Sequence, residues 1–165
     1  MGPWVESKSR SICLDDVDPS VFHIYASWLY RRRLPVHVDA PGVEDNAQYM
    51  MLARAYVLGD RLQDAAFCDA CIDVMVGKAR TKLARGDAWC VPAGPVIDYI
   101  YDNTTPSSAA RRFLLDLYFH SDQSYRLEDE WADPDVDLPI EFLFDISAQL
   151  LERRPILANA LFANP

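Results

Sequence analysis

Apolar residues at helical spacing recur along most of this chain, and helix-stopping residues separate the runs. The first run follows Asp18-Pro19, a pair that favours the start of a helix. Aspartate can accept an orphan backbone N–H, and proline's fixed φ fits the first helical position. Arg31–Arg33 complement the negative end of such a helix, and Pro35 prevents its continuation. The apolar face of this run comprises Val21, Phe22, Ile24, Tyr25, Trp28 and Leu29. The pattern predicts a helix between Pro19 and the arginines.

Five further stretches show the same helical period. They begin near Asn46, Leu62, Pro95, Ser108 and Pro139. In the first of them, Gly59 is expected to end the helix in a left-handed cap. In the last, the side chains expected to face the core are Ile140, Leu143, Ile146 and Leu150. These stretches predict a predominantly helical chain.

Two short stretches instead favour β-strands. Residues 11–16 alternate apolar and polar side chains, which is the two-residue period of a strand with one buried face. Residues 34–38 can form a second strand, at a sheet edge because Pro35 lacks a backbone N–H. The side chains on one side of it would be Leu34, Val36 and Val38. The expected fold class is therefore α+β, with helices predominating.

The bulk properties limit the classes of function. The chain has 165 residues, half of them hydrophobic, which suits one domain or a small domain with a helical extension. Its net charge is −9, whereas nucleic-acid binders usually carry clustered Lys and Arg, so no nucleic-acid partner is expected. No run approaches the roughly 20 apolar residues of a membrane span, and the first residues lack a secretory h-region. We therefore expect an intracellular protein of the cytoplasm or nucleus, without membrane contact.

The acidic stretch at residues 121–138 contains a partial calcium-loop pattern. Asp133, Asp135 and Asp137 have the spacing that opens such a loop. The sixth position, which needs a glycine, is Leu138, and the twelfth, which needs a bidentate glutamate, is Phe144. A solvated acidic linker is therefore the favoured interpretation of this stretch.

Cys68 and Cys71 form a C-x-x-C pair, which two further ligands would complete as a zinc site. Both cysteines belong to an apolar helical stripe, where a free cysteine is a common core residue. The chain has no G-x-S-x-G nucleophile elbow and no glycine-rich phosphate loop. We therefore expect no catalytic residue, no cofactor and no metal. A small metal-dependent hydrolase that uses the three aspartates or the cysteine pair is the open alternative.

Three motifs in order resemble the BTB/POZ domain, especially its filamentous-fungal group. The resemblance spans roughly residues 4–120. The first motif comprises Ile12-Cys13-Leu14-Asp15-Asp16, Asp18-Pro19, Phe22, Trp28-Leu29-Tyr30 and Leu34-Pro35. The second is the run from Tyr56 to Asp64, which is similar to the turn between the two following helices of that fold. The third, similar to the helical tail after the domain, comprises Tyr101-Asp102-Asn103-Thr104-Thr105, Ser108 and Arg111-Arg112.

The resemblance, together with the acidic stretch and the last helical run, divides the chain into four expected parts. These are a partial BTB/POZ-like core at 1–80, an accessory helical region at 81–120, an acidic linker at 121–138 and a C-terminal helix with a tail at 139–165. The family's opening β-hairpin and its next two helices, which carry a histidine-lysine segment, have no counterpart here. Because that part supplies much of the family's dimer interface, a homodimer of the family's type is not expected.

The function that the resemblance implies is protein–protein interaction. Within the family this means a substrate adaptor for a cullin-type ubiquitin ligase or a transcription-associated scaffold, so the expected partner is a cullin scaffold or another BTB chain. Cullin contact in the family uses an apolar residue two positions before an acid, a pattern that Val43 and Asp45 match. Trp28 and Tyr30 are amphipathic enough to lie half within a partner surface. A remnant of the domain with only a structural role is the further alternative.

Overall fold

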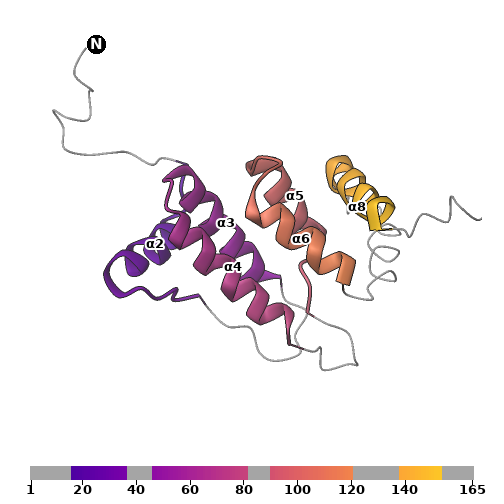
Figure 1. Ribbon diagram of the computed structural model, residues 1–165. Helices are drawn as coiled ribbons and strands as arrows, with labels where there is room; N and C mark the ends of the chain where they lie inside the picture. The colour runs from indigo at the N-terminus through magenta and orange to yellow at the C-terminus, as the bar shows by residue number, and fades with distance from the viewer. Residues whose placement is uncertain (1–15, 37–45, 82–89, 121–137, 154–165) are drawn as a thin grey trace, which may run out of the picture.

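The computed structural model describes residues 16–36, 46–81, 90–120 and 138–153, and these residues form six helices (Figure 1). The helices are α2 Pro19–Arg31, α3 Ala47–Arg61, α4 Ala65–Ala79, α5 Gly94–Asn103, α6 Ala109–His120 and α8 Ile140–Arg153. None of the described ranges contains a strand. The predicted α+β class is therefore wrong for this part of the chain, which is helical. No helix within these ranges is both long and apolar enough to cross a membrane.

The strand predicted at residues 34–38 is not formed at its described positions. Leu34 and Val36 lie in irregular backbone, where the N–H of Val36 donates to the carbonyl of Leu34 at 2.9 Å. A bond between residues two apart makes a tight turn, and the described residues offer these two no neighbouring strand. Val38 and the other predicted strand, at residues 11–15, lie outside the described residues. Asp16, the last residue of that prediction, is in a turn.

The helices form a row (Figure 1). α2 packs on α3, which also packs on α4 and α5. α6 packs on α4 and α5, and α8 covers both α5 and α6. Figure 1 shows α2 at one end of the row and α8 at the other. The row therefore leaves one side of each terminal helix without a further described helix against it.

A cluster of buried side chains extends from α2 to α8 through this row. Its largest fully buried members include Tyr49, Leu52, Phe67, Met75, Ile97, Ile100, Leu114 and Phe142. Aromatic rings meet edge to face at both ends of the cluster: Tyr25 and Phe67 have centroids 4.9 Å apart, and Tyr101 and Phe142 have centroids 5.6 Å apart. Edge-to-face ring pairs stabilise the packing of the helices beyond what the burial of apolar surface alone provides.

Gly59 lies within α3, so the prediction that it ends this helix is wrong. The left-handed residue is instead Gln63, with a φ of 57°, in the connection to α4. A Cβ atom on Gly59 would lie 2.7 Å from Cδ1 of Phe67 and 2.9 Å from Sγ of Cys68. The glycine is therefore needed because α3 and α4 approach each other closely at this point.

The face of α8 that enters the core differs from the prediction. Phe142 and Ile146 are buried, and Leu143 is half-buried. Ile140 and Leu150, which were also expected to face the core, are exposed. The helix carries apolar side chains on two sides, and helical spacing alone does not say which side meets α5 and α6.

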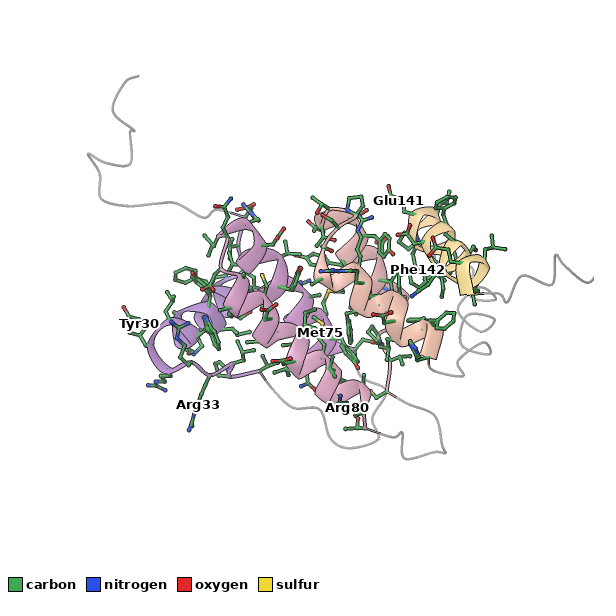
Figure 2. All side chains as sticks on the ribbon, viewed as in Figure 1. Tyr30, Arg33, Met75, Arg80, Glu141 and Phe142 are labelled. Carbon is green, nitrogen blue, oxygen red and sulfur yellow. The ribbon has the colours of Figure 1, made fainter. Side chains whose placement is uncertain are left out.

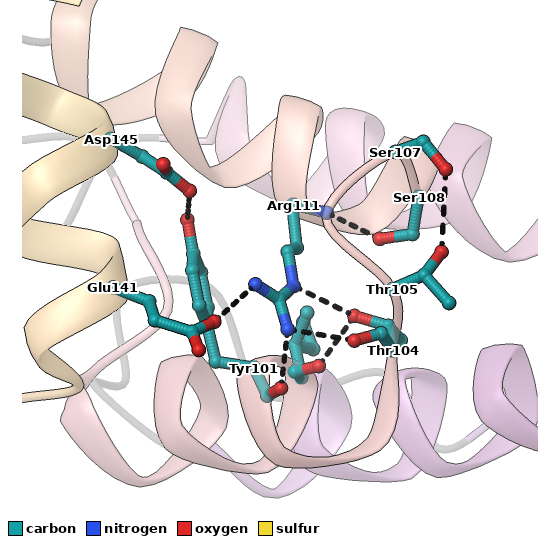
Figure 3. A network of polar contacts seen from close by, with 9 residues as sticks. Tyr101, Thr104, Thr105, Ser107, Ser108, Arg111, Glu141 and Asp145 are labelled. Atoms are coloured by element: carbon teal, nitrogen blue, oxygen red, sulfur yellow. Dashed lines mark hydrogen bonds and ion pairs between the residues drawn. The ribbon is translucent and has the colours of Figure 1, made fainter. Parts of the chain in front are cut away.

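The side chain of Arg111, in α6, joins α5 and α8 (Figure 3). It is 4% exposed and donates hydrogen bonds to the carbonyl oxygens of Tyr101 and Thr104, at 2.6 and 2.7 Å. Its other terminal nitrogen donates to a carboxylate oxygen of Glu141 at 2.7 Å, and its guanidinium lies 4.2 Å from the centre of the Tyr101 ring. The Tyr101 hydroxyl donates in turn to Asp145 of α8 at 3.1 Å. Arg111 thus satisfies carbonyls that the end of α5 leaves without helical partners.

Candidate partner-binding surface

The start and the end of α2 follow the local signals of the sequence. The side chain of Asp18 accepts the N–H of Ser20 at 2.8 Å, and Pro19 is the first helical residue. At the other end, Arg32 has a φ of 51° and donates its N–H to the carbonyl of Trp28 at 2.9 Å. The buried residues Val21 and Ile24 face the core. Tyr25 and Trp28 also pack partly against the core, and the opposite side of the helix is left for solvent or a partner.

Three large apolar side chains of α2 are exposed, next to exposed arginines. Tyr30 is 89% exposed, Leu29 50% and Phe22 44%. Arg31–Arg33 are all exposed as well. Figure 2 shows Tyr30 and Arg33 projecting away from the body of the protein. We call Phe22, Leu29, Tyr30 and Arg31–Arg33 the α2 surface.

Trp28 and Tyr30, both predicted to contact a partner, lie in different environments. The Trp28 ring is half-buried, with its centroid 6.0 Å from that of Phe67. The Arg32 guanidinium lies over it, 5.0 Å from the ring centre. Trp28 thus anchors α2 to α4 and supports Arg32, whereas Tyr30 is open to contact. Val43 and Asp45, the other predicted contacts, lie outside the described residues.

A second exposed apolar surface, on α8, was missed because part of it was assigned to the core. Ile140 is 84% exposed, Phe144 71% and Leu151 66%. Leu150 is also exposed, but it follows the buried Ile146 by four residues and therefore lies on the core-facing side of the helix. We call Ile140, Phe144 and Leu151 the α8 surface. The available signal was that the helix has more apolar residues than one stripe can hold.

Among the concave regions, the groove between α4 and α6 has a volume of about 490 Å³. Its apolar lining comprises Val76, Ala79, Phe113 and Leu117, and its polar residues are Arg80, Asp116 and His120. Gln149 of α8 donates to the carboxylate of Asp116 at 3.2 Å, and Nδ1 of His120 lies 2.8 Å from the Asp116 carbonyl oxygen. Asp116 and His120 are therefore engaged with the protein itself.

A smaller cavity, of about 230 Å³, contains two aspartates that the chain uses structurally. Asp16 pairs with Arg61 at 2.8 Å, and the hydrogen bond from Arg61 lowers the pKa of Asp16. The hydrogen bonds from Ser20 lower the pKa of Asp18 in the same way. Both carboxylates therefore stay ionised as a helix cap and an ion-pair partner, and neither has the raised pKa of a general acid.

The C-x-x-C cysteines are buried core residues. Burial raises the pKa of the Cys68 thiol to about 11 and raises the pKa of Cys71 further still. The Cys68 thiol donates a weak hydrogen bond to the carbonyl of Tyr56 at 3.6 Å. Within the described ranges, no group of three or more His, Cys, Asp or Glu residues is placed to hold a metal ion. The predicted aspartates at 133, 135 and 137 lie outside those ranges.

Alkylation of Cys68 should therefore be slow in the folded chain. At pH 8, iodoacetamide is expected to modify Cys68 at least about 100-fold more slowly than in the unfolded chain, because only the thiolate reacts and its fraction falls tenfold per pKa unit. The measurement is timed alkylation read by peptide mass spectrometry, with the chain in guanidinium chloride as control. Equal rates in the two states would contradict the buried position.

Comparison of the chain with models of known protein families, with curated proteins and with solved structures found no match. The BTB/POZ resemblance therefore depends on its sequence motifs alone. The strands that this resemblance implied are absent from the described residues, so the described part of the fold does not support a BTB-type sheet.

Proposed function

We propose that this chain is a protein–protein interaction module that binds its partner through the α2 surface. The observation that carries the proposal is the exposure of Tyr30 and Leu29 beside three exposed arginines. Contiguous exposed apolar side chains with a polar rim typically mark interaction sites. Tyr and Arg are also the residue types most enriched where interfaces gain most of their binding energy.

The chemistry of the α2 surface selects an acidic partner. Arg31–Arg33 present guanidinium groups, which pair with carboxylates through parallel hydrogen bonds. Leu29 supplies apolar area beside them, and Phe22, seven residues earlier, extends that area along the helix. The partner should therefore carry carboxylates next to exposed apolar side chains. The arginines would raise the association rate and reject basic partners, while apolar burial would supply most of the affinity.

A narrower proposal is that the module serves as a substrate adaptor for a cullin-type ubiquitin ligase or as a transcription-associated scaffold. The order of the three BTB-like motifs supports it. A location in the cytoplasm or nucleus belongs to the same proposal, supported by cysteines that remain free thiols at Cys68, Cys71 and Cys90.

The test compares three tagged full-length chains in affinity purification from the native cells: wild type, Y30E/R33E and R112E. Arg112 is an exposed arginine of α6, so R112E matches the charge reversal outside the α2 surface. A partner enriched by wild type and R112E should then be purified and its affinity for each chain measured. We expect Y30E/R33E to bind at least about 10-fold more weakly, because interface hot spots contribute about 2 kcal/mol or more.

Two results would contradict the proposal. One is equal affinity of the purified partner for wild type and Y30E/R33E. The other is that neither wild type nor R112E enriches any protein over Y30E/R33E, including untagged copies of the chain itself. The first result would mean that the partner binds outside the α2 surface, and the second would mean that this surface has no partner.

A further inference from the structure

The α8 surface is a stripe distinct from the side of α8 that enters the core. Ile140, Phe144 and Leu151 are spaced by four and seven residues, which places them along one line of a helix. The buried residues Phe142 and Ile146 lie on another side. α8 is therefore apolar toward the core and apolar toward solvent, and the second stripe has no described helix against it.

Two exposed carboxylates of α8 lie near the α8 surface. Glu152 is exposed, and the side chain of Glu141 is 70% exposed even though one of its oxygens accepts the bond from Arg111. The α8 surface thus offers carboxylates next to exposed apolar side chains, which is the chemistry that the α2 surface selects.

One copy of the chain cannot join these two surfaces to each other. The row of helices places α2 at one end and α8 at the other (Figure 1). The two surfaces can therefore meet only between different copies. A contact between two unlike surfaces is heterologous, and it leaves one free surface at each end of every assembly that does not close on itself.

We propose that the α2 surface of one copy binds the α8 surface of a second copy, so that copies associate head to tail. This inference rests on the proposed function and names its partner. In the contact, Arg31–Arg33 of one copy face Glu141 and Glu152 of the next, and Tyr30 packs beside Phe144. The assembly closes into a ring or extends as a filament, depending on the rotation between copies.

The alternative symmetric contacts place like charges together. Two α2 surfaces facing each other would bring two sets of three arginines together. Two α8 surfaces facing each other would oppose Glu141 and Glu152 with their own copies. Like charges across an interface are strongly unfavourable, whereas the unlike contact places the arginines of the α2 surface against Glu141 and Glu152.

The test uses two full-length variants that each block one surface. Y30E/R33E introduces carboxylates into the α2 surface, and F144K/L151K introduces ammonium groups into the α8 surface. All four positions are exposed, so both variants should fold, which circular dichroism melting checks. Sedimentation velocity then compares wild type, each variant alone and their equimolar mixture over a wide concentration range.

We expect the mass of wild type to rise with concentration and each variant alone to remain monomeric. The mixture should form a heterodimer of about twice the monomer mass and nothing larger, because each variant keeps one free surface of opposite kind. A monomeric wild type at every concentration, a variant that still associates alone, or a mixture that stays monomeric would each overturn the proposal.

The outcome can be separated from that of the proposed function. Suppose that wild type is monomeric, but that a purified protein other than the chain itself binds wild type and not Y30E/R33E. The head-to-tail contact is then wrong, and the binding function of the α2 surface stands. If wild type is monomeric and Y30E/R33E loses no partner, both are wrong.

Discussion

Replacing Phe142 with alanine is expected to lower the free energy of unfolding by about 3–5 kcal/mol. The Phe142 side chain is fully buried where α8 meets α5 and α6. Its ring centroid lies 5.6 Å from that of Tyr101 and 5.4 Å from that of Tyr118, with both pairs edge to face. Removing the ring leaves a cavity and ends both contacts. Equilibrium unfolding in guanidinium chloride measures the change.

Phe144 provides the matched control, because it is the same residue type two positions along the same helix. Its side chain is largely exposed, as part of the α8 surface. Phe144→Ala is expected to change the free energy of unfolding by no more than about 0.5 kcal/mol, as is usual for surface positions. Comparable losses in the two variants would mean that α8 does not pack with Phe142 inward.

The ends of α2 could be predicted from the sequence because their signals are local. The cap at Asp18, the proline at Pro19 and the arginines at the end act within one helical turn, and the structure confirms a helix from Pro19 to Arg31. The same reasoning anticipated helices near each of the five later starting points. Local chemistry is therefore sufficient to locate most of the helices of this chain.

Strand formation and close packing depend on residues far apart in sequence, which is why they were predicted less well. Leu34 and Val36 have the alternation of a strand, but a strand needs a neighbour, and the described chain supplies none there. Glycine often ends a helix, yet Gly59 is needed inside α3 because Phe67 of α4 approaches it closely. Neither outcome can be read from the residues next to it.

The candidate partner-binding surface was predicted only in part, because the exposure of a side chain also depends on residues far apart in sequence. Trp28 and Tyr30 are neighbours in sequence with similar chemistry, and both were assigned to a partner surface. Phe67 and Arg32 cover Trp28, whereas Tyr30 is left open. The α8 surface was missed because which stripe of α8 is buried depends on the rings that α5 and α6 present to it.

Replacing Arg111 with alanine is expected to lower the free energy of unfolding by about 2–4 kcal/mol, as measured by urea unfolding. The loss comes chiefly from the carbonyls of Tyr101 and Thr104, because a buried acceptor without a donor costs about 1–3 kcal/mol. Glu141 contributes little, because its side chain is 70% exposed and stays solvated without the arginine. Glu141→Gln should therefore cost no more than about 1 kcal/mol.

Arg112 gives the control for helix propensity and charge, because it is the next residue of α6 and is exposed. Arg112→Ala is expected to cost no more than about 0.5 kcal/mol. Arg111→Lys then separates charge from geometry: a lysine keeps the charge but lacks the planar fork that reaches two carbonyls and Glu141 together. It should retain less than half of the arginine's contribution. If the lysine variant is as stable as wild type, the positive charge holds α5, α6 and α8 together and the fork does not.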